Sequence, residues 1–158
     1  MSRGTAFACP LPLIRCWTLG CLTRFLMSSS PFEIIVPVVA ADIDEQNHVN
    51  NTVYLRWIQD VATAHWRAIA GREAQDTIGW IVLRHEIDYK APAMLGDEIV
   101  LRTWVGTATR LTFERFTEIR RKSDGRLLSQ ARTLWCPINA QTGRPMRVSA
   151  EVRAQFST

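Results

Sequence analysis

The pattern of apolar and polar positions predicts one long helix in the middle of this chain. Across residues 53–70, polar side chains recur at spacings of three and four, and almost all of the remaining positions are apolar. This pattern is typical of a helix with one narrow polar stripe and three covered sides. Asn50 or Asn51 is a suitable N-cap, and Gly71 is a suitable end for the helix. The polar stripe consists of Arg56, Gln59, Asp60, Thr63 and Arg67.

A β-branched run before that helix and period-two alternation after it predict strands on both sides. A β-branched run covers residues 33–40, and Pro37 places it at a sheet edge or a bulge, because proline lacks the N–H that a ladder needs. In residues 80–89 the alternation predicts a single face that is apolar apart from one histidine, which is expected to be a hydrogen-bonded core residue. That face consists of Ile81, Leu83, His85, Ile87 and Tyr89. Further strands are expected over residues 98–106, 111–122 and 127–138.

These elements predict an α+β fold, with a curved, mostly antiparallel five-stranded sheet wrapped around one long helix. Tight turns such as Ser123-Asp124-Gly125 join the later strands. A short last helix is expected over residues 149–156, capped by Ser149. A curved five-stranded sheet leaves its edges open, and two copies could close one of them by pairing. We therefore expect a homodimer.

Length and composition predict one folded domain preceded by an extension. The chain has 158 residues, which suits a single domain, and we assign residues 31–158 to it and residues 1–30 to the extension. The apolar part of residues 1–26 is interrupted by prolines and arginines, so no membrane span is expected there, and the pattern favours Met27 as the true start. Outside that segment the sole cysteine is Cys136. The absence of paired cysteines and of metal-ligand spacing favours a reducing cytoplasm and no metal.

The basic residues indicate a phosphate-bearing small ligand or a solvated surface. Of the 19 Lys and Arg residues, 17 are Arg, and the guanidinium group suits bidentate contact with phosphate. No block of basic residues and no aromatic-basic motif occurs, so nucleic acid is not the expected partner.

The segment between the first strand and the helix carries the candidate chemistry. It reads Asp42-Ile-Asp44-Glu-Gln-Asn-His48-Val-Asn-Asn51. A helix start presents unpaired N–H groups and partial positive charge, and the N–H groups of residues 49–51 could therefore hold an oxyanion. Asp44 could act on a thioester as general base or nucleophile, and His48 could donate a hydrogen bond or a proton. The alternative is that both aspartates only cap the turn, and for Asp42 that interpretation is preferred.

Three groups of residues resemble a known family. They are Asp44-x-x-x-His48-Val-Asn50-Asn51-x-x-Tyr54-x-x-Trp57, Ile87-x-Tyr89-Lys90-x-Pro92-x-x-x-Gly96-Asp97, and Thr142-Gly-Arg144-Pro145. Over residues 33–157 the chain resembles the hotdog-fold acyl-CoA thioesterases of the 4-hydroxybenzoyl-CoA thioesterase type. The resemblance implies that Asp44 is the catalytic carboxylate and that His48 assists it. It also implies a homodimer or homotetramer, built of dimers or dimer pairs, with the sites at the subunit interface and without metal or cofactor. Many relatives carry glycine at the position of Asn47, and plant acyl-carrier-protein thioesterases carry asparagine at that of Gln46.

The remaining candidates are residues for substrate contact. The acyl group is expected to meet Asn47, Asn51, Tyr54 and Trp57, and the CoA phosphates are expected to meet Lys90, Arg110 and Arg144. The alternatives are loop-bracing asparagines, plain core aromatics and solvent-facing charges.

We expect hydrolysis of an acyl-CoA thioester to the free acid and CoA. Two other functions stay open: a hotdog hydratase or dehydratase acting on enoyl or hydroxyacyl thioesters, and a non-catalytic acyl-CoA binding module.

Overall fold

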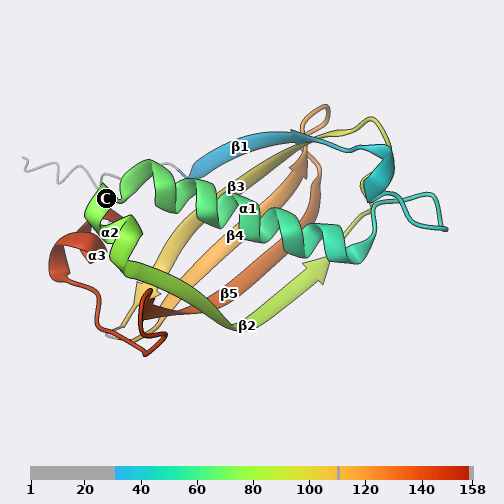
Figure 1. Cartoon of the computed structure of the whole chain (residues 1–158). Coiled ribbons are helices and arrows are strands. Elements are labelled where there is room, and N and C mark those ends of the chain that lie inside the picture. Colours follow the sequence, from blue (N-terminus) through green and yellow to red (C-terminus); the bar gives the residue numbers. More distant parts are fainter. Residues whose placement is uncertain (1–30, 110, 157–158) are drawn as a thin grey trace, which may run out of the picture.

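A single antiparallel sheet curves around one long helix (Figure 1). The structure is a computed structural model that describes residues 31–109 and 111–156, so the predicted extension over residues 1–30 lies outside the described residues. The strands pair in the order β1-β3-β4-β5-β2, with every pairing antiparallel. Their bounds are β1 Phe32–Pro37, β2 Ile78–Tyr89, β3 Glu98–Ala108, β4 Phe113–Arg121 and β5 Leu127–Asn139. The predicted α+β sheet-and-helix architecture is confirmed.

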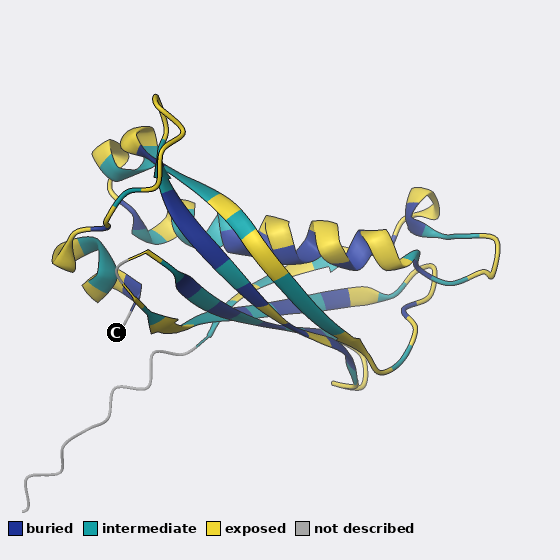
Figure 2. Ribbon diagram, turned by 90° about the horizontal axis from the view of Figure 1, so that it is seen from below, coloured by how far each residue is buried: buried dark blue, intermediate teal, exposed yellow. Residues whose placement is uncertain are grey.

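Helix α1, Asn51–Ile69, lies across the concave side of the sheet. Asn50 is its N-cap, and the Asn50 Oδ1 atom accepts a hydrogen bond from the Thr52 N–H at 2.9 Å. One broad face of α1 is buried, while Leu55 and most of the polar stripe are exposed and Thr63 is half-buried, so the expectation of three covered sides is wrong. No second layer of the described chain covers the far side of α1, as the alternation of buried and exposed positions in Figure 2 shows. The buried residues of α1 are Val53, Tyr54, Trp57, Ile58, Val61 and Ala62.

Strand β2 departs from the predicted pattern because it contains a β-bulge. Val82 pairs with Trp135 and Arg84 pairs with Leu134, so Leu83 is an extra residue between two ladder positions. A bulge reverses the side-chain alternation that follows it. Ile81 and Leu83 are consequently 45% and 55% exposed, whereas Ile87 packs against the core, and the single face predicted for residues 81–89 is wrong.

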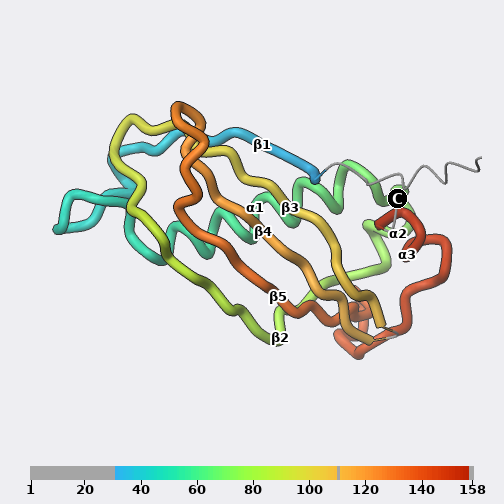
Figure 3. Tube along the Cα trace, turned by 180° about the vertical axis from the view of Figure 1, so that it is seen from behind, coloured from blue at the N-terminus to red at the C-terminus, as the bar shows by residue number. Residues whose placement is uncertain are grey.

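Two short helices flank the sheet at the end where α1 terminates (Figure 3). Helix α2, Arg72–Thr77, was not expected, since its polar sequence has no apolar periodicity. Helix α3, Ala150–Phe156, agrees with the predicted terminal helix, and Ser149 Oγ accepts from the Val152 N–H at 3.3 Å. Phe156 at the end of α3 is buried among aromatic side chains.

Strand β2 is an edge strand and connects the two ends of the molecule. Its first residue, Ile78, follows α2, and its last residue, Tyr89, lies beside the start of α1. The Tyr89 hydroxyl donates to the Asn51 carbonyl at 3.3 Å, and its ring contacts the Tyr54 ring edge to face. The outer edge of β2 has no strand partner among the described residues.

Candidate active site

The loop over residues 43–50, at the N-terminal end of α1, is closed by backbone hydrogen bonds between its two arms. Ile43 and Val49 form an isolated antiparallel bridge, and the Asp44 N–H donates to the His48 carbonyl at 2.9 Å. The Asn47 N–H donates back to the Asp44 carbonyl at 3.0 Å. These bonds fix the backbone on both sides of Asp44 and His48.

Asp44 and His48 face one another inside this loop. The His48 Nδ1 atom lies 3.5 Å from Asp44 Oδ2, and the Asp44 side chain is 21% exposed. Asp44 Oδ1 accepts from the Gln46 N–H at 2.9 Å, and His48 Nε2 lies 3.1 Å from Gln46 Oε1. One carboxylate oxygen is therefore held by the backbone, while the other is directed at the imidazole and remains partly accessible.

Asp42 has a structural role, in agreement with the sequence interpretation. Its side chain is buried and forms an ion pair with Arg56, whose Nη2 atom lies 2.6 Å from Asp42 Oδ1. It also accepts a hydrogen bond from the Val39 N–H at 3.1 Å. These bonds fasten the chain that enters the loop to α1.

The backbone N–H groups at the helix start are mostly occupied. Val49 N donates to the Ala93 carbonyl and Asn50 N to the Asp42 carbonyl, each at 2.9 Å. The N–H of Asn51 has no backbone acceptor among the described residues. Of the three donors expected for an oxyanion, Asn51 N is the one that the fold leaves available.

Asn47, in the middle of this loop, has a left-handed backbone conformation. Its φ is +63°, in the left-handed region that glycine and asparagine tolerate. Asn47 can therefore keep the turn that glycine would make.

We predict that Asn47→Gly keeps both the fold and the activity. Asn47→Val should lower the free energy of unfolding by about 1–2 kcal/mol, because a β-branched residue is strained at positive φ, and should also lower kcat/KM by displacing Asp44 and His48. Thermal unfolding and steady-state assays of both variants measure this. Equal stability of the two variants would contradict the prediction.

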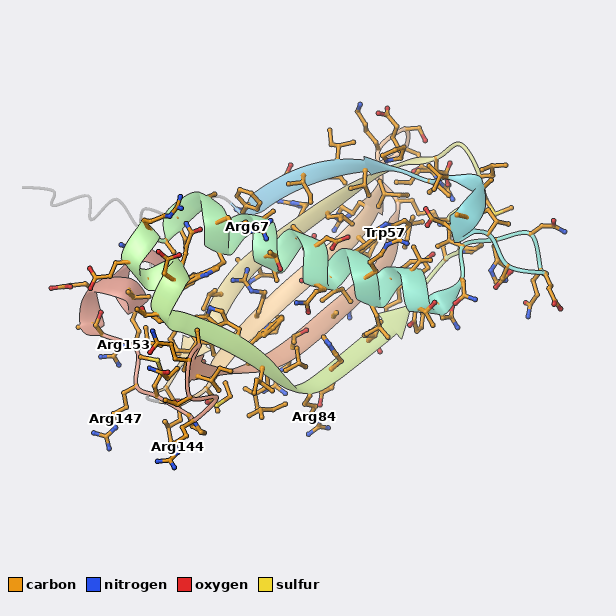
Figure 4. The ribbon with its side chains drawn as sticks, viewed as in Figure 1. Trp57, Arg67, Arg84, Arg144, Arg147 and Arg153 are labelled. Carbon is orange, nitrogen blue, oxygen red and sulfur yellow. The ribbon has the colours of Figure 1, made fainter. Side chains whose placement is uncertain are left out.

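The other predicted contacts are not gathered at this loop. Tyr54 and Trp57 are each 2% exposed and lie in the core, where the Tyr54 hydroxyl accepts from the Ala93 N–H at 2.9 Å. Asn51 is exposed at the first turn of α1, and Lys90 is exposed and paired with Asp88. Arg144 points away from the fold beyond the end of β5 (Figure 4), and Arg110 lies outside the described residues. Substrate contact by these residues stays a prediction.

A cavity of about 420 Å³ lies at the opposite end of α1, between that helix and the first half of β2. The sequence interpretation missed it, because its walls come from segments far apart in the chain. Five aromatic side chains line it, together with polar residues of α1 and α2. The aromatic lining residues are Trp66, Trp80, Phe113, Trp135 and Phe156.

Arg115 is a buried cation that lines this cavity. It extends from β4, is 6% exposed, and its Nη1 atom lies 3.0 Å from His65 Nδ1 and 3.1 Å from Thr103 Oγ1. Since arginine only donates, His65 Nδ1 is the acceptor and the imidazole is neutral. The guanidinium also lies 5.9 Å from the centre of the Phe156 ring. The signal for Arg115 was present in the sequence, because it occupies an inward position in the alternation of Phe113, Thr117 and Ile119.

We predict a pH dependence of stability that originates at His65. Burial and the Arg115 charge lower its pKa to about 4, whereas the unfolded chain takes up a proton near pH 6.5. Stability from the neutral imidazole is therefore complete above about pH 6.5 and is lost as the pH falls from 6.5 to 4, by about 2–3 kcal/mol. His65→Gln retains an acceptor for Arg115 and should unfold with a smaller change in free energy between pH 7.5 and 4.5. Equal changes in both proteins, measured with denaturant, would contradict this.

The comparisons with known proteins agree with this architecture. A model of the thioesterase-like superfamily matches residues 38–156. The chain belongs to the thioesterase-like superfamily. Membership places the protein among the thioester hydrolases and confirms the family resemblance found in the sequence. No protein of curated function matches the chain.

Several solved structures share the hotdog fold with the chain. The 1,4-dihydroxy-2-naphthoyl-CoA thioesterase Slr0204 from Synechocystis is 18% identical, with 79% of this chain and 94% of that one covered and a TM-score of 0.69. A thioesterase from Thermus thermophilus, complexed with coenzyme A and Zn, is 22% identical over 82% and 99%, with a TM-score of 0.72. The protein SAV2348 from Staphylococcus aureus, in complex with CoA, is 18% identical over 80% and 82%, with a TM-score of 0.71.

Within residues 31–109 and 111–156, no three His, Cys, Asp or Glu side chains gather as ligands for a metal ion. Among the helices of that same part, none combines the length and the apolar character needed to cross a bilayer.

Proposed function

We propose that this protein hydrolyses an acyl-CoA thioester to the free acid and CoA, with Asp44 as general base or nucleophile. The observation that carries the proposal is the position of the Asp44 carboxylate, 3.5 Å from His48 and directly before the N-terminus of α1. Relatives with the same fold bind CoA. The predicted cytoplasmic location remains an expectation from the cysteines.

The chemistry follows from these groups. With Asp44 as base, water adds to the thioester carbonyl carbon while its proton passes to the carboxylate. The carbonyl oxygen becomes negative beside the N-terminus of α1, where the Asn51 N–H and the helix dipole stabilise it. The C–S bond then breaks, and the CoA thiolate takes a proton from His48 or from Asp44. If Asp44 is instead the nucleophile, its oxygen displaces CoA and water hydrolyses the resulting anhydride.

The acyl group needs a binding site, and we assign it to the aromatic cavity of a second copy. Within one protomer, Asp44 and the cavity lie at opposite ends of α1, whose 19 residues span about 28 Å. A two-fold axis perpendicular to the sheet would pair two β2 edges antiparallel and keep both α1 helices on the same side. The Tyr89 end of one β2 then lies beside the Ile78 end of the other. Asp44 of one protomer thereby approaches the cavity of its neighbour.

The same pairing suits the predicted CoA contacts. Lys90 follows the end of β2, and Arg144 lies beside the start of β2, where Pro145 bridges to Ile138. An antiparallel β2 pair would bring Lys90 of one copy toward Arg144 of the other. The exposed apolar side chains of Ile81 and Leu83 on β2 favour such a covered edge.

An assay of thiol release over a panel of acyl-CoAs tests the function. Free CoA from saturated acyl-CoAs, in proportion to enzyme, is the expected result. Hydration of crotonyl-CoA without thiol release would overturn the proposal in favour of a hydratase, and tight binding without any product would favour a binding module. Size-exclusion chromatography with light scattering tests the dimer, and an active monomer would contradict it.

A further inference from the structure

The deep end of the aromatic cavity carries a positive charge that no carboxylate of residues 31–109 and 111–156 neutralises. Arg115 is buried there, and its partners are the neutral His65, the Thr103 hydroxyl and the Phe156 ring. The described residues offer it no ion pair. Burial lowers the pKa of Arg115 to about 10, so the group is still charged at pH 7. A buried cation without a counter-ion is unfavourable unless a ligand supplies the opposite charge.

The same cavity holds further hydrogen-bond donors without acceptors. Trp80 Nε1 and Trp135 Nε1 are buried, line the cavity and have no hydrogen-bond partner among the described atoms. Buried indole N–H groups normally find an acceptor. The one carboxylate of the lining, Asp76, lies on exposed α2 and faces Arg72 at 3.8 Å. The buried polar side-chain atoms that Arg115, Trp80 and Trp135 contribute to the lining are therefore all donors.

We propose that the preferred acyl group ends in a carboxylate, which Arg115 binds at the inner end of the aromatic cavity. This inference rests on the proposed function, because it identifies the acyl group of the thioester that Asp44 attacks. The aromatic walls contact the methylene chain or ring between the two ends of the acyl group. The carboxylate accepts hydrogen bonds from the guanidinium and from the indole N–H groups within reach. The substrate class is accordingly the monothioester of a dicarboxylic acid.

Matched acyl pairs provide the test. Adipoyl-CoA and hexanoyl-CoA have the same chain length and differ only in the terminal carboxylate, and 4-carboxybenzoyl-CoA and benzoyl-CoA form the corresponding aromatic pair. We expect kcat/KM to favour the carboxylated member of at least one pair by roughly 10- to 100-fold, as suits a charge-assisted hydrogen bond. The two pairs decide between a chain and a ring.

Variants of Arg115 separate recognition from a structural role. Arg115→Met should lower kcat/KM for the carboxylated member far more than for its uncharged counterpart, so that the ratio of the two falls to about one. Arg115→Lys keeps the charge and should retain part of the preference. Arg120→Met is the matched control, because Arg120 lies on the same strand, bonds to Glu118 and Gly125, and does not line the cavity. A purely structural Arg115 would reduce both rates together.

Binding of the free diacid gives a readout that needs no turnover. Three tryptophans line the cavity, so adipate or terephthalate should change the tryptophan fluorescence of wild type and of Arg120→Met but not of Arg115→Met. If no acyl-CoA is hydrolysed, the proposed function fails while diacid binding still tests Arg115. Hydrolysis that favours hexanoyl-CoA and benzoyl-CoA, with ratios unchanged in Arg115→Met, would overturn the inference and leave the proposed function intact.

Discussion

Asp44→Asn is expected to lower kcat by about 1000-fold for the best acyl-CoA while leaving the fold intact. General acid–base groups typically contribute 100- to 10,000-fold, hence the order of magnitude. The amide cannot take a proton from water or attack a carbonyl carbon, yet it has the same shape. Its Oδ1 atom can still accept from the Gln46 N–H, as the carboxylate does. Thermal unfolding should therefore be nearly unchanged, and a thiol-release assay measures the loss.

Asp42→Asn is the matched control two residues away. The buried Asp42 carboxylate holds Arg56 at 2.6 Å, and its neutral replacement should lower the free energy of unfolding by about 1–2 kcal/mol. Activity of the folded fraction should remain. The two aspartates thus predict opposite results, one catalytic and one structural. Wild-type turnover in Asp44→Asn would refute the catalytic assignment.

The fold was largely predictable because periodicity carries most of it. The three-and-four spacing across residues 53–70 specifies α1, and the alternation in residues 98–138 specifies the three strands that form the centre of the sheet. The bulge at Leu83 was not predictable, because an inserted residue leaves an unbroken apolar alternation in the sequence and is visible only in the pairing with β5. The far side of α1 was misjudged for a similar reason, since apolar positions do not reveal which side another layer covers.

The site was predictable only in the part that is local in sequence. Asp44 and His48 are four residues apart, so the loop that joins them could be recognised from the motif. The cavity combines residues of α1, α2, β2, β3, β4, β5 and α3, and contacts across such separations leave no short pattern. His65 and Arg115 each interrupt an apolar face, and that interruption was the one signal of a buried polar cluster.

We predict that two inactive variants restore activity when they form a mixed dimer, because each proposed site combines Asp44 of one protomer with the cavity of the other. Asp44→Asn removes the proposed catalytic carboxylate. Thr63→Trp places a large ring in the cavity from α1 and should block the acyl group, since Thr63 lines that cavity and is half-buried. Each variant alone should be nearly inactive, because both sites of a symmetric dimer carry the same defect. Gln59→Trp, from a more exposed position of the lining, is a second blocking variant.

Co-expression of the two variants with different affinity tags allows the mixed dimer to be purified. If each site combines Asp44 of one protomer with the cavity of the other, one of the two sites in the mixed dimer carries both defects and the other carries none. The mixed dimer should then recover about half of the wild-type activity, as two-fold symmetry requires. If Asp44 and the cavity of one protomer served the same site, every site would carry one defect and the mixed dimer would be inactive. A double variant, Asp44→Asn with Thr63→Trp, paired with Asp44→Asn should give no recovery, because no site in that dimer retains a carboxylate at position 44.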